Sequence, residues 1–243
     1  MKKESRGIAI KVCIIGGLLI VAWILSKYVL KLFDTEKDRA ELQKALQAAD
    51  VGDYVTLGVY EQDNDESNGK EPIEWLVLDK QDDRVLVISR YALDWVKFNE
   101  FEASVTWETC TLRGWLNDAF IREVFDPNES ERILSTKVTA DINPLLDTSP
   151  GNDTTDRIFL LSILEAERYF ASDSERACLA TEYCHARGSF RDADGYCWWW
   201  LRTPGTDRYR ASYINHEGMV RNAGHVHDAL YSLRPAMWLS TKP

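Results

Sequence analysis

The side chains best suited to ligand binding lie near the C-terminus, between Thr206 and Tyr231. This stretch is rich in aromatic, Arg, Asn and His residues, and the segments on either side of it are apolar. Such side chains on loops held by a rigid framework supply binding chemistry at low entropic cost. The alternative is an ordinary polar surface. We predict that the ligand-binding residues are Arg208, Tyr209, Tyr213, His216, Arg221, His225 and His227.

Two histidines in this stretch, His225 and His227, have a spacing that could serve a metal ion. On a strand both rings would project from one face, as a metal pair requires. Asp228 and His216 are conceivable further ligands, but neither has a secure position, and surface histidines are the alternative. We therefore predict no metal at this site.

An acidic segment that begins at Asp63 has oxygen ligands at spacings similar to those of a calcium loop. It lacks the glycine that an EF-hand loop has at its sixth position, and it leads into a strand. We expect an acidic hairpin loop with a turn at Asn68-Gly69 and no cofactor. Calcium held by Asp63, Asp65 and Glu74 is the alternative.

Catalytic arrangements are not evident. Cys184 and His185 are adjacent, but catalytic partners meet in space and neither residue has an identifiable orienting group. No Gly-rich phosphate loop is present. Disulfides are possible in an exported domain, and four cysteines allow three connectivities between which the sequence does not choose. These four are Cys110, Cys178, Cys184 and Cys197.

Composition narrows the class of protein. Hydrophobic residues make up 45% and charged residues 28% of the chain, which is typical of a globular protein. A net charge of −10 excludes a nucleic-acid partner, because binding to phosphates needs a basic surface.

The N-terminal region resembles a membrane anchor. Residues 12–25 carry no charge, and a helix over residues 12–30 would span roughly 28 Å, close to the thickness of the bilayer hydrocarbon. No small-residue cleavage site follows the run, so we predict an uncleaved transmembrane anchor in the cell membrane, with the C-terminal domain extracytoplasmic. The charge asymmetry that sets orientation is weak. The predicted parts are a tail and anchor over residues 1–31, a helical stalk over 32–50 and a globular domain over 51–243.

Periodicity predicts the elements of that domain. Strands are expected at residues 54–60, 73–78 and 85–89, paired consecutively and antiparallel. Helical spacing is expected between residues 106 and 125, and a capping box starts a helix at Ser162. Three adjacent tryptophans, Trp198 to Trp200, cannot all face one core, since neighbours on a strand point to opposite sides. We predict an α+β fold with one mostly antiparallel sheet and helices to one side.

Several motifs resemble a bacterial family, the domain of unknown function 6273. The motifs are Gly52-Asp53-Tyr54-Val55, residues 61–65, 71–75, 107–113 and 150–153, Cys197-Trp198-Trp199-Trp200-Leu201-Arg202-Thr203-Pro204-Gly205 and Leu233-Arg234-Pro235-Ala236-Met237-Trp238. The resemblance covers the chain from about Asp50 onward. The layout of the last two motifs is similar to C-type-lectin-like folds, including the formylglycine-generating type, so the resemblance implies such a domain.

Together these observations favour a binding module for an unknown protein or glycan over an enzyme. Two alternatives stay open. One is an extracytoplasmic enzyme of unknown reaction with the tryptophans lining a cleft, and the other is a structural component of the cell envelope. A shallow aromatic surface would favour the binding module, whereas a deep pocket with convergent polar groups would favour the enzyme. Arg202 and Arg234 lie in apolar segments, so we predict that they are scaffold residues held by charge-assisted hydrogen bonds.

Overall fold

The computed structural model describes residues 36–242. The chain divides into two units, Met1–Lys44 and Ala45–Pro243. Residues 36–48 are helical, and Leu46 and Ala49, three positions apart, are buried. The elements described below belong to the second unit.

One sheet contains four antiparallel strands, in the order β1-β2-β3-β11. Its strands are β1 (Tyr54–Tyr60), β2 (Glu71–Gln81), β3 (Arg84–Ser89) and β11 (Ala236–Ser240). Buried residues alternate with more exposed ones along most of β1 and β2, while five of the six residues of β3 are buried. A central strand covered on both faces has that continuous apolar character. The prediction of three consecutive antiparallel strands is confirmed.

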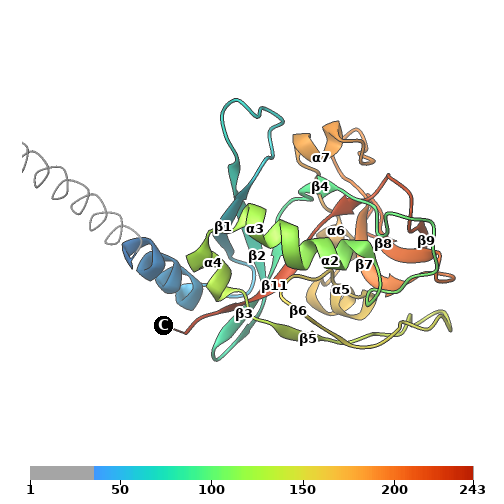
Figure 1. Cartoon of the computed structure of the whole chain (residues 1–243), viewed down its shortest axis with the longest axis horizontal. Helices are drawn as coiled ribbons and strands as arrows, with labels where there is room; N and C mark the ends of the chain where they lie inside the picture. The colour runs from blue at the N-terminus through green and yellow to red at the C-terminus, as the bar shows by residue number, and fades with distance from the viewer. Residues whose placement is uncertain (1–35, 243) are drawn as a thin grey trace, which may run out of the picture. The chain divides into compact units, whose positions relative to one another are not determined.

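A second sheet has five strands, in the order β4-β10-β7-β8-β9. Its strands are β4 (Asp94–Trp95), β10 (Ser232–Leu233), β7 (Trp199–Pro204), β8 (Arg210–Ile214) and β9 (Val220–His225). The β10–β7 pairing is parallel and the others are antiparallel. A small third sheet pairs β5 (Thr136–Val138) with β6 (Thr154–Asp156). Figure 1 shows β7, β8 and β9 together at one end of the domain.

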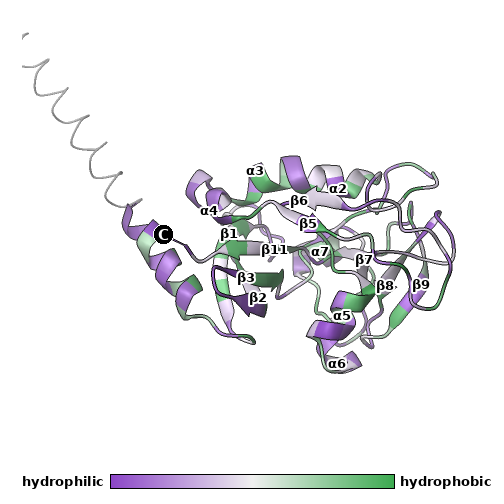
Figure 2. Ribbon diagram, turned by 90° about the horizontal axis from the view of Figure 1, so that it is seen from below, coloured by the Kyte–Doolittle hydropathy of each residue, from purple (hydrophilic) through white to green (hydrophobic). Residues whose placement is uncertain are grey.

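Most helices of this unit are short, although the first three elements below follow one another without a break over residues 111–124. They are α2 (Thr111–Trp115), a π-helical turn (Leu116–Phe120), α3 (Ile121–Val124), α4 (Pro127–Arg132), α5 (Ile163–Tyr169), α6 (Asp173–Arg176) and α7 (Glu182–Ala186). The predicted capping box at Ser162 is present, and its hydroxyl accepts a hydrogen bond from the Glu165 backbone N–H. Figure 2 shows hydrophobic and hydrophilic colours alternating along α5, which buries Ile163 and Ala166.

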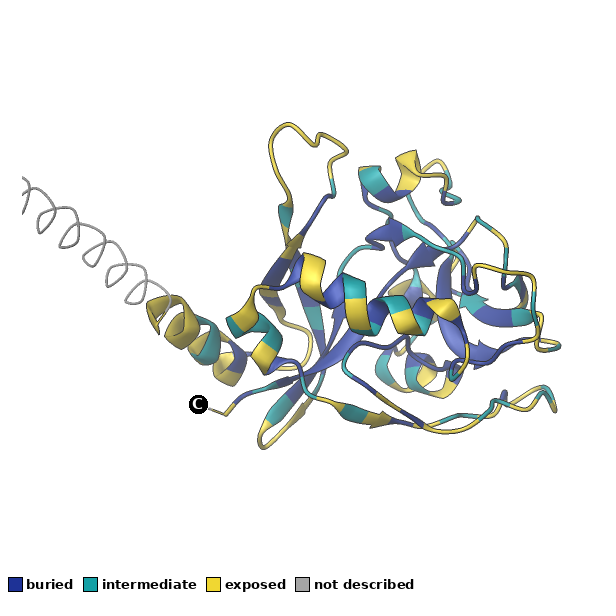
Figure 3. Ribbon diagram, viewed as in Figure 1, coloured by how far each residue is buried: buried dark blue, intermediate teal, exposed yellow. Residues whose placement is uncertain are grey.

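Tryptophans occupy much of the core. Trp75, Trp115, Trp200 and Trp238 each lie in an apolar periodic segment of the sequence, which predicts that they are largely buried. Trp75 and Trp200 are fully buried and Trp238 is 8% exposed. Trp115 is more exposed than these three, since its ring is half-buried and lines a cavity. Figure 3 shows burial concentrated in the strands, while the loop that connects β1 and β2 is exposed.

The predicted fold class was wrong. The domain is β-rich, with three sheets instead of one. Residues 111–124 form one continuous helical stretch, but each of the other helices of this unit has only 4 to 7 residues, so they do not form a helical layer beside a single sheet. The physical reason is frequent interruption, as at Asp126-Pro127, where an extended residue precedes a proline and ends one helix before the next begins. Within residues 36–242, no helix combines the length and apolar composition that a membrane crossing requires. The predicted span, residues 12–30, lies outside the described residues.

Candidate functional site

Four half-buried rings form a continuous surface beside β7 and β8. We call Phe190, Trp198, Tyr213 and His216 the aromatic surface. Phe190 stacks on Trp198, with ring centroids 4.2 Å apart and planes at 23°. Tyr213 lies 5.6 Å from Trp198, and His216 lies 5.5 Å from Phe190. The indole N–H of Trp198 donates to Nδ1 of His216 at 3.2 Å, which leaves Nε2 of that ring to carry the proton.

Buried rings support this surface from below. Tyr231 is 4% exposed and its ring centroid lies 4.7 Å from that of Tyr213 and 3.9 Å from that of Trp200. The Trp200 indole N–H donates to the Val96 carbonyl at 2.9 Å. Burial raises the pKa of Tyr213 and that of Tyr231, so both stay neutral phenols at physiological pH. The half-buried rings therefore rest on a fixed aromatic floor.

An exposed cation lies at the edge of this surface. Arg221 on β9 is the direct cross-strand partner of Tyr213 on β8, which is in turn the partner of Trp200 on β7. Directly opposed residues in an antiparallel pair have neighbouring side chains. The Arg221 side chain is exposed and donates to the Val220 carbonyl at 3.3 Å. Flat rings and a guanidinium thus lie side by side, which is a surface that can both stack and hydrogen-bond a ligand.

The structure separates the seven predicted binding residues into two groups. Tyr213, His216 and Arg221 lie toward the end of the β8–β9 hairpin where Ile214 pairs with Val220. The remaining four lie at or beyond the other end of the hairpin, where Arg210 pairs with His225. These four are Arg208, Tyr209, His225 and His227. The four-residue separation along β8 corresponds to roughly 13 Å, so one small ligand does not contact both groups.

The second group has its own surroundings. Arg208 donates to the Ser149 hydroxyl at 2.9 Å and lines a polar cavity of about 330 Å³. Tyr209 is 45% exposed. His225 lies 3.8 Å from a Glu102 carboxylate oxygen, while Nδ1 of His227 is buried without a hydrogen-bond partner. Since β9 ends at His225, the two histidines do not share a strand face as a metal pair would need.

A cluster of acidic oxygens lies at the base of the β1–β2 loop. Glu61, Asp63 and Glu71 have ligand oxygens within 4.8 Å of one another, the one such group among residues 36–242. All three already accept hydrogen bonds within this hairpin. Glu61 accepts from the Asp65 N–H at 3.0 Å, Asp63 accepts from the same N–H at 2.8 Å, and Glu71 accepts from the Gln62 N–H at 2.7 Å. These contacts explain the cluster as part of the loop's own structure.

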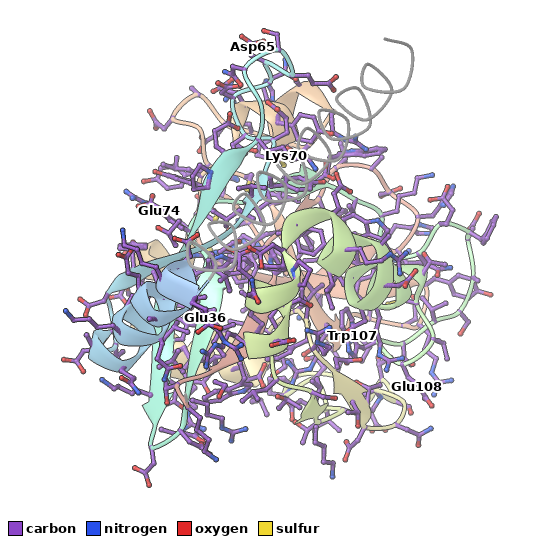
Figure 4. All side chains as sticks on the ribbon, turned by 60° about the vertical axis from the view of Figure 1, so that its left-hand side comes forward. Glu36, Asp65, Lys70, Glu74, Trp107 and Glu108 are labelled. Carbon is purple, nitrogen blue, oxygen red and sulfur yellow. The ribbon has the colours of Figure 1, made fainter. Side chains whose placement is uncertain are left out.

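The alternative calcium set, Asp63, Asp65 and Glu74, is not assembled. Figure 4 shows Asp65 at the tip of the hairpin and Glu74 well down strand β2. The carboxylate of Glu74 forms an ion pair with Arg90 at 2.7 Å instead.

A cavity of about 380 Å³ lies beside β4, with Trp95, Trp115 and Arg187 in its wall. Asp94 is 3% exposed and also contributes to the wall. Its carboxylate accepts hydrogen bonds from the Tyr60 hydroxyl at 2.6 Å and from the Trp95 N–H at 2.7 Å, and it pairs with Arg187 at 3.0 Å. Burial raises the pKa of Asp94. Sequence reasoning missed this carboxylate, although an Asp in the apolar run of residues 92–96 is an unusual position for a charge.

The cavity does not show an assembled catalytic group. A general base needs an accepting lone pair directed at a substrate, whereas Asp94 already binds three donors of its own chain.

Cys184 is fully buried, its thiol contacts the Ser189 hydroxyl at 3.3 Å, and burial raises its pKa to about 12. A thiol in that state is a poor nucleophile.

Comparison with known protein families identifies the family to which the chain belongs. A domain of unknown function, DUF6273, matches residues 82–241, which is well over half of the sequence. The chain belongs to this family. The match confirms the resemblance noted in the sequence, although it begins later than Asp50. Neither a curated protein nor a solved structure matches the chain, so the likeness to C-type-lectin-like folds has no support.

Proposed function

We propose that this member of the family is a binding module that captures its ligand on the aromatic surface, with Arg221 as a polar anchor at the edge. The observation that carries the proposal is the stacked pair Phe190 and Trp198, half-buried on a floor of fully packed rings. Exposed aromatic side chains held rigid lose little entropy on binding and offer large contact areas.

The chemistry of the surface favours a glycan. A pyranose ring has an apolar C–H face, which packs on a flat aromatic ring, and hydroxyl groups at its edge, which hydrogen-bond to polar side chains. Trp198 supplies the flat ring, and His216 and Arg221 supply the polar groups beside it. A protein ligand is the alternative, and it would use the same rings as anchor points.

An enzymatic role is the second candidate, because the cavity next to Asp94 has aromatic walls and a carboxylate with a raised pKa. The three donors that already occupy Asp94 weigh against it.

The extracytoplasmic location is part of our proposal and is supported by the uncharged run at residues 12–25.

The two ends of the β8–β9 hairpin can be tested separately with exposed residues. The full chain is applied to a glycan array and to a cell-surface protein array, and bound ligands are titrated against the variants Arg221→Ala and Tyr209→Ala. We expect Arg221→Ala to weaken binding by about tenfold, since truncation of an anchor Arg costs more than about 1 kcal/mol. Tyr209→Ala should bind as the parent does.

Arg168→Ala is the matched control, since Arg168 is an exposed arginine on α5 outside the aromatic surface. All three variants should unfold within about 0.5 kcal/mol of the parent, as expected for exposed sites. Unchanged binding of Arg221→Ala to every captured ligand, or unfolding of that variant, would remove the main support for the proposal. Capture on the protein array alone would replace a glycan by a protein ligand.

A further inference from the structure

Two buried cysteines lie directly opposite each other on neighbouring extended segments. Leu179 and Tyr196 form an antiparallel bridge, and one position farther along each segment come Cys178 and Cys197. The Cys197 N–H donates to the Cys178 carbonyl at 2.9 Å. Opposed residues of this hydrogen-bonded type have Cα atoms about 5.5 Å apart, which lies within the range that a disulfide spans.

The side chains of this pair are enclosed by the fold. Cys178 is 2% exposed and Cys197 is fully buried, and the Cys178 sulfur lies 3.5 Å from the Leu179 carbonyl oxygen and 3.6 Å from that of Arg90. The other two described cysteines have different partners. Cys184 contacts the Ser189 hydroxyl, and the Cys110 thiol donates to a backbone carbonyl at 3.4 Å. Of the connectivities that four cysteines allow, the structure therefore favours one pair.

A buried cation lies near the same sulfur atoms. Arg234 is 3% exposed, and its guanidinium lies 4.9 Å from the centroid of the Trp199 ring. Among the ion pairs within residues 36–242, none joins Arg234 to a carboxylate. Burial raises the pKa of a thiol, but at Cys178 the hydrogen bond from Cys197 and the charge of Arg234 outweigh burial and lower the pKa. The thiolate is the form that attacks a disulfide.

We propose that Cys178 and Cys197 are a covalent cross-linking site, joined as a disulfide by exchange with a low-molecular-weight disulfide such as oxidised glutathione. The Cys178 thiolate attacks one sulfur of the reagent, forms a mixed disulfide and releases one glutathione thiolate. Cys197 then gives up its proton and attacks the Cys178 sulfur, which displaces the second glutathione. Two protein thiols lose two electrons, one reagent disulfide gains them, and the two protons end on the two released thiols.

Burial determines when this exchange takes place. Both sulfur atoms are inaccessible in the folded domain, so the reagent reaches them during folding or after local opening of residues 178–197. The cross-link closes the segment that contains α7 and Phe190, and it fixes the residue directly before Trp198. It requires no ligand and does not depend on the proposed binding function.

The test uses the full chain, unfolded in urea and refolded in mixtures of reduced and oxidised glutathione. Free thiols are then alkylated under denaturing conditions, and peptides are mapped by mass spectrometry without reduction. We expect one peptide pair joined through Cys178 and Cys197, lacking the two thiol hydrogens. Cys110→Ser should retain this pair, while Cys178→Ser and Cys197→Ser should each lose it.

Reduction of the cross-linked chain should lower the midpoint of thermal unfolding by about 5–10 °C, because the cross-link restricts the unfolded chain. The shift should be absent in Cys197→Ser. Alkylation of both cysteines at every glutathione ratio, or a cross-link from either one to Cys110 or Cys184, would overturn the proposal. The mapping is done on the unmodified sequence, so the result does not depend on whether a serine variant folds.

Discussion

Replacement of Arg202 should destabilise the domain more than replacement of any exposed arginine. Arg202 lies on β7 and is 3% exposed. Its guanidinium donates to the Leu160 carbonyl at 2.9 Å and to the Thr139 carbonyl at 3.2 Å. It also pairs with Asp141 at 3.0 Å and with Glu165 at the start of α5. One side chain thus connects the second sheet to a long loop and to a helix, as the scaffold role predicted for it requires.

The size of the effect follows from what Arg202→Met leaves behind. The substitution keeps an extended apolar side chain but removes every donor, so the carbonyls of Leu160 and Thr139 lose their partner. Removal of one member of a buried ion pair costs about 3–5 kcal/mol. The side chains of Asp141 and Glu165 are 20% and 27% exposed and can regain some hydration, so we expect the lower end, about 3 kcal/mol. For a domain of this size, that corresponds to a fall of about 6–12 °C in the unfolding midpoint.

Circular dichroism of the full chain during heating at neutral pH measures this fall. Arg122→Met is the matched control, because Arg122 also pairs with a carboxylate, that of Asp118, but its side chain is 67% exposed. Exposed pairs contribute little, so the control should melt with the parent. The reasoning is refuted if Arg202→Met melts within about 2 °C of the parent, or if Arg122→Met falls by a similar amount.

Two further variants test the core and the buried carboxylate. Trp238→Ala should lower the free energy of unfolding by about 3–5 kcal/mol in urea titrations, because the ring is 8% exposed and packs against Arg84 at 4.2 Å; a midpoint equal to the parent's would contradict this. Burial raises the pKa of Asp94 above its ordinary 3.8. The folded chain therefore holds this proton at pH values where the unfolded chain has lost it. As a result, this group increases the stability of the parent as the pH falls. In urea titrations between neutral pH and pH 4, Asp94→Asn should lack this gain, and a constant difference between the two proteins would argue against a raised pKa.

Local patterns in the sequence predicted the first sheet well. The β-branched and aromatic composition of residues 54–60 predicted β1 at its observed bounds, and Asp82-Asp83 indicates the turn between β2 and β3. The capping box at Ser162 located the start of α5. These features depend on residues close together in the chain, so their physical causes can be read in a short window.

Pairing between distant segments could not be predicted in this way. The run from Ser232 to Ser240 reads as one closing strand, yet it forms β10 in one sheet and β11 in another. Arg234 and Pro235 separate the two, because a proline lacks the N–H that a continuous ladder needs and Arg234 instead donates to the Ser89 carbonyl at 3.1 Å. Which sheet each half joins depends on β4 and β3, which lie far earlier in the chain, and on β7.

The candidate site was predicted in part. Residue types singled out Tyr213, His216 and Arg221, and the three adjacent tryptophans indicated that at least one would line a second packed layer or a surface groove. Phe190 was missed, since it lies on a loop after α7 and joins the surface only through its stack on Trp198. A lone aromatic residue beside Gly188 and Ser189 gives no periodic signal from which such a contact could be inferred.

Successive side chains along residues 197–202 project to opposite sides of the strand. This explains why residues of the core, of the aromatic surface and of the scaffold lie in one segment. Trp198 and Trp200 are two apart and project to the same side, where both contact Tyr231, while Trp199 projects to the other side, near Arg234. Arg202 at one end and Cys197 at the other tie this segment to the rest of the domain. If the aromatic surface binds a ligand, Arg202→Met should therefore reduce both stability and binding, whereas Arg221→Ala should reduce binding alone. A pair of variants with that pattern would separate the residues that position the surface from those that touch the ligand.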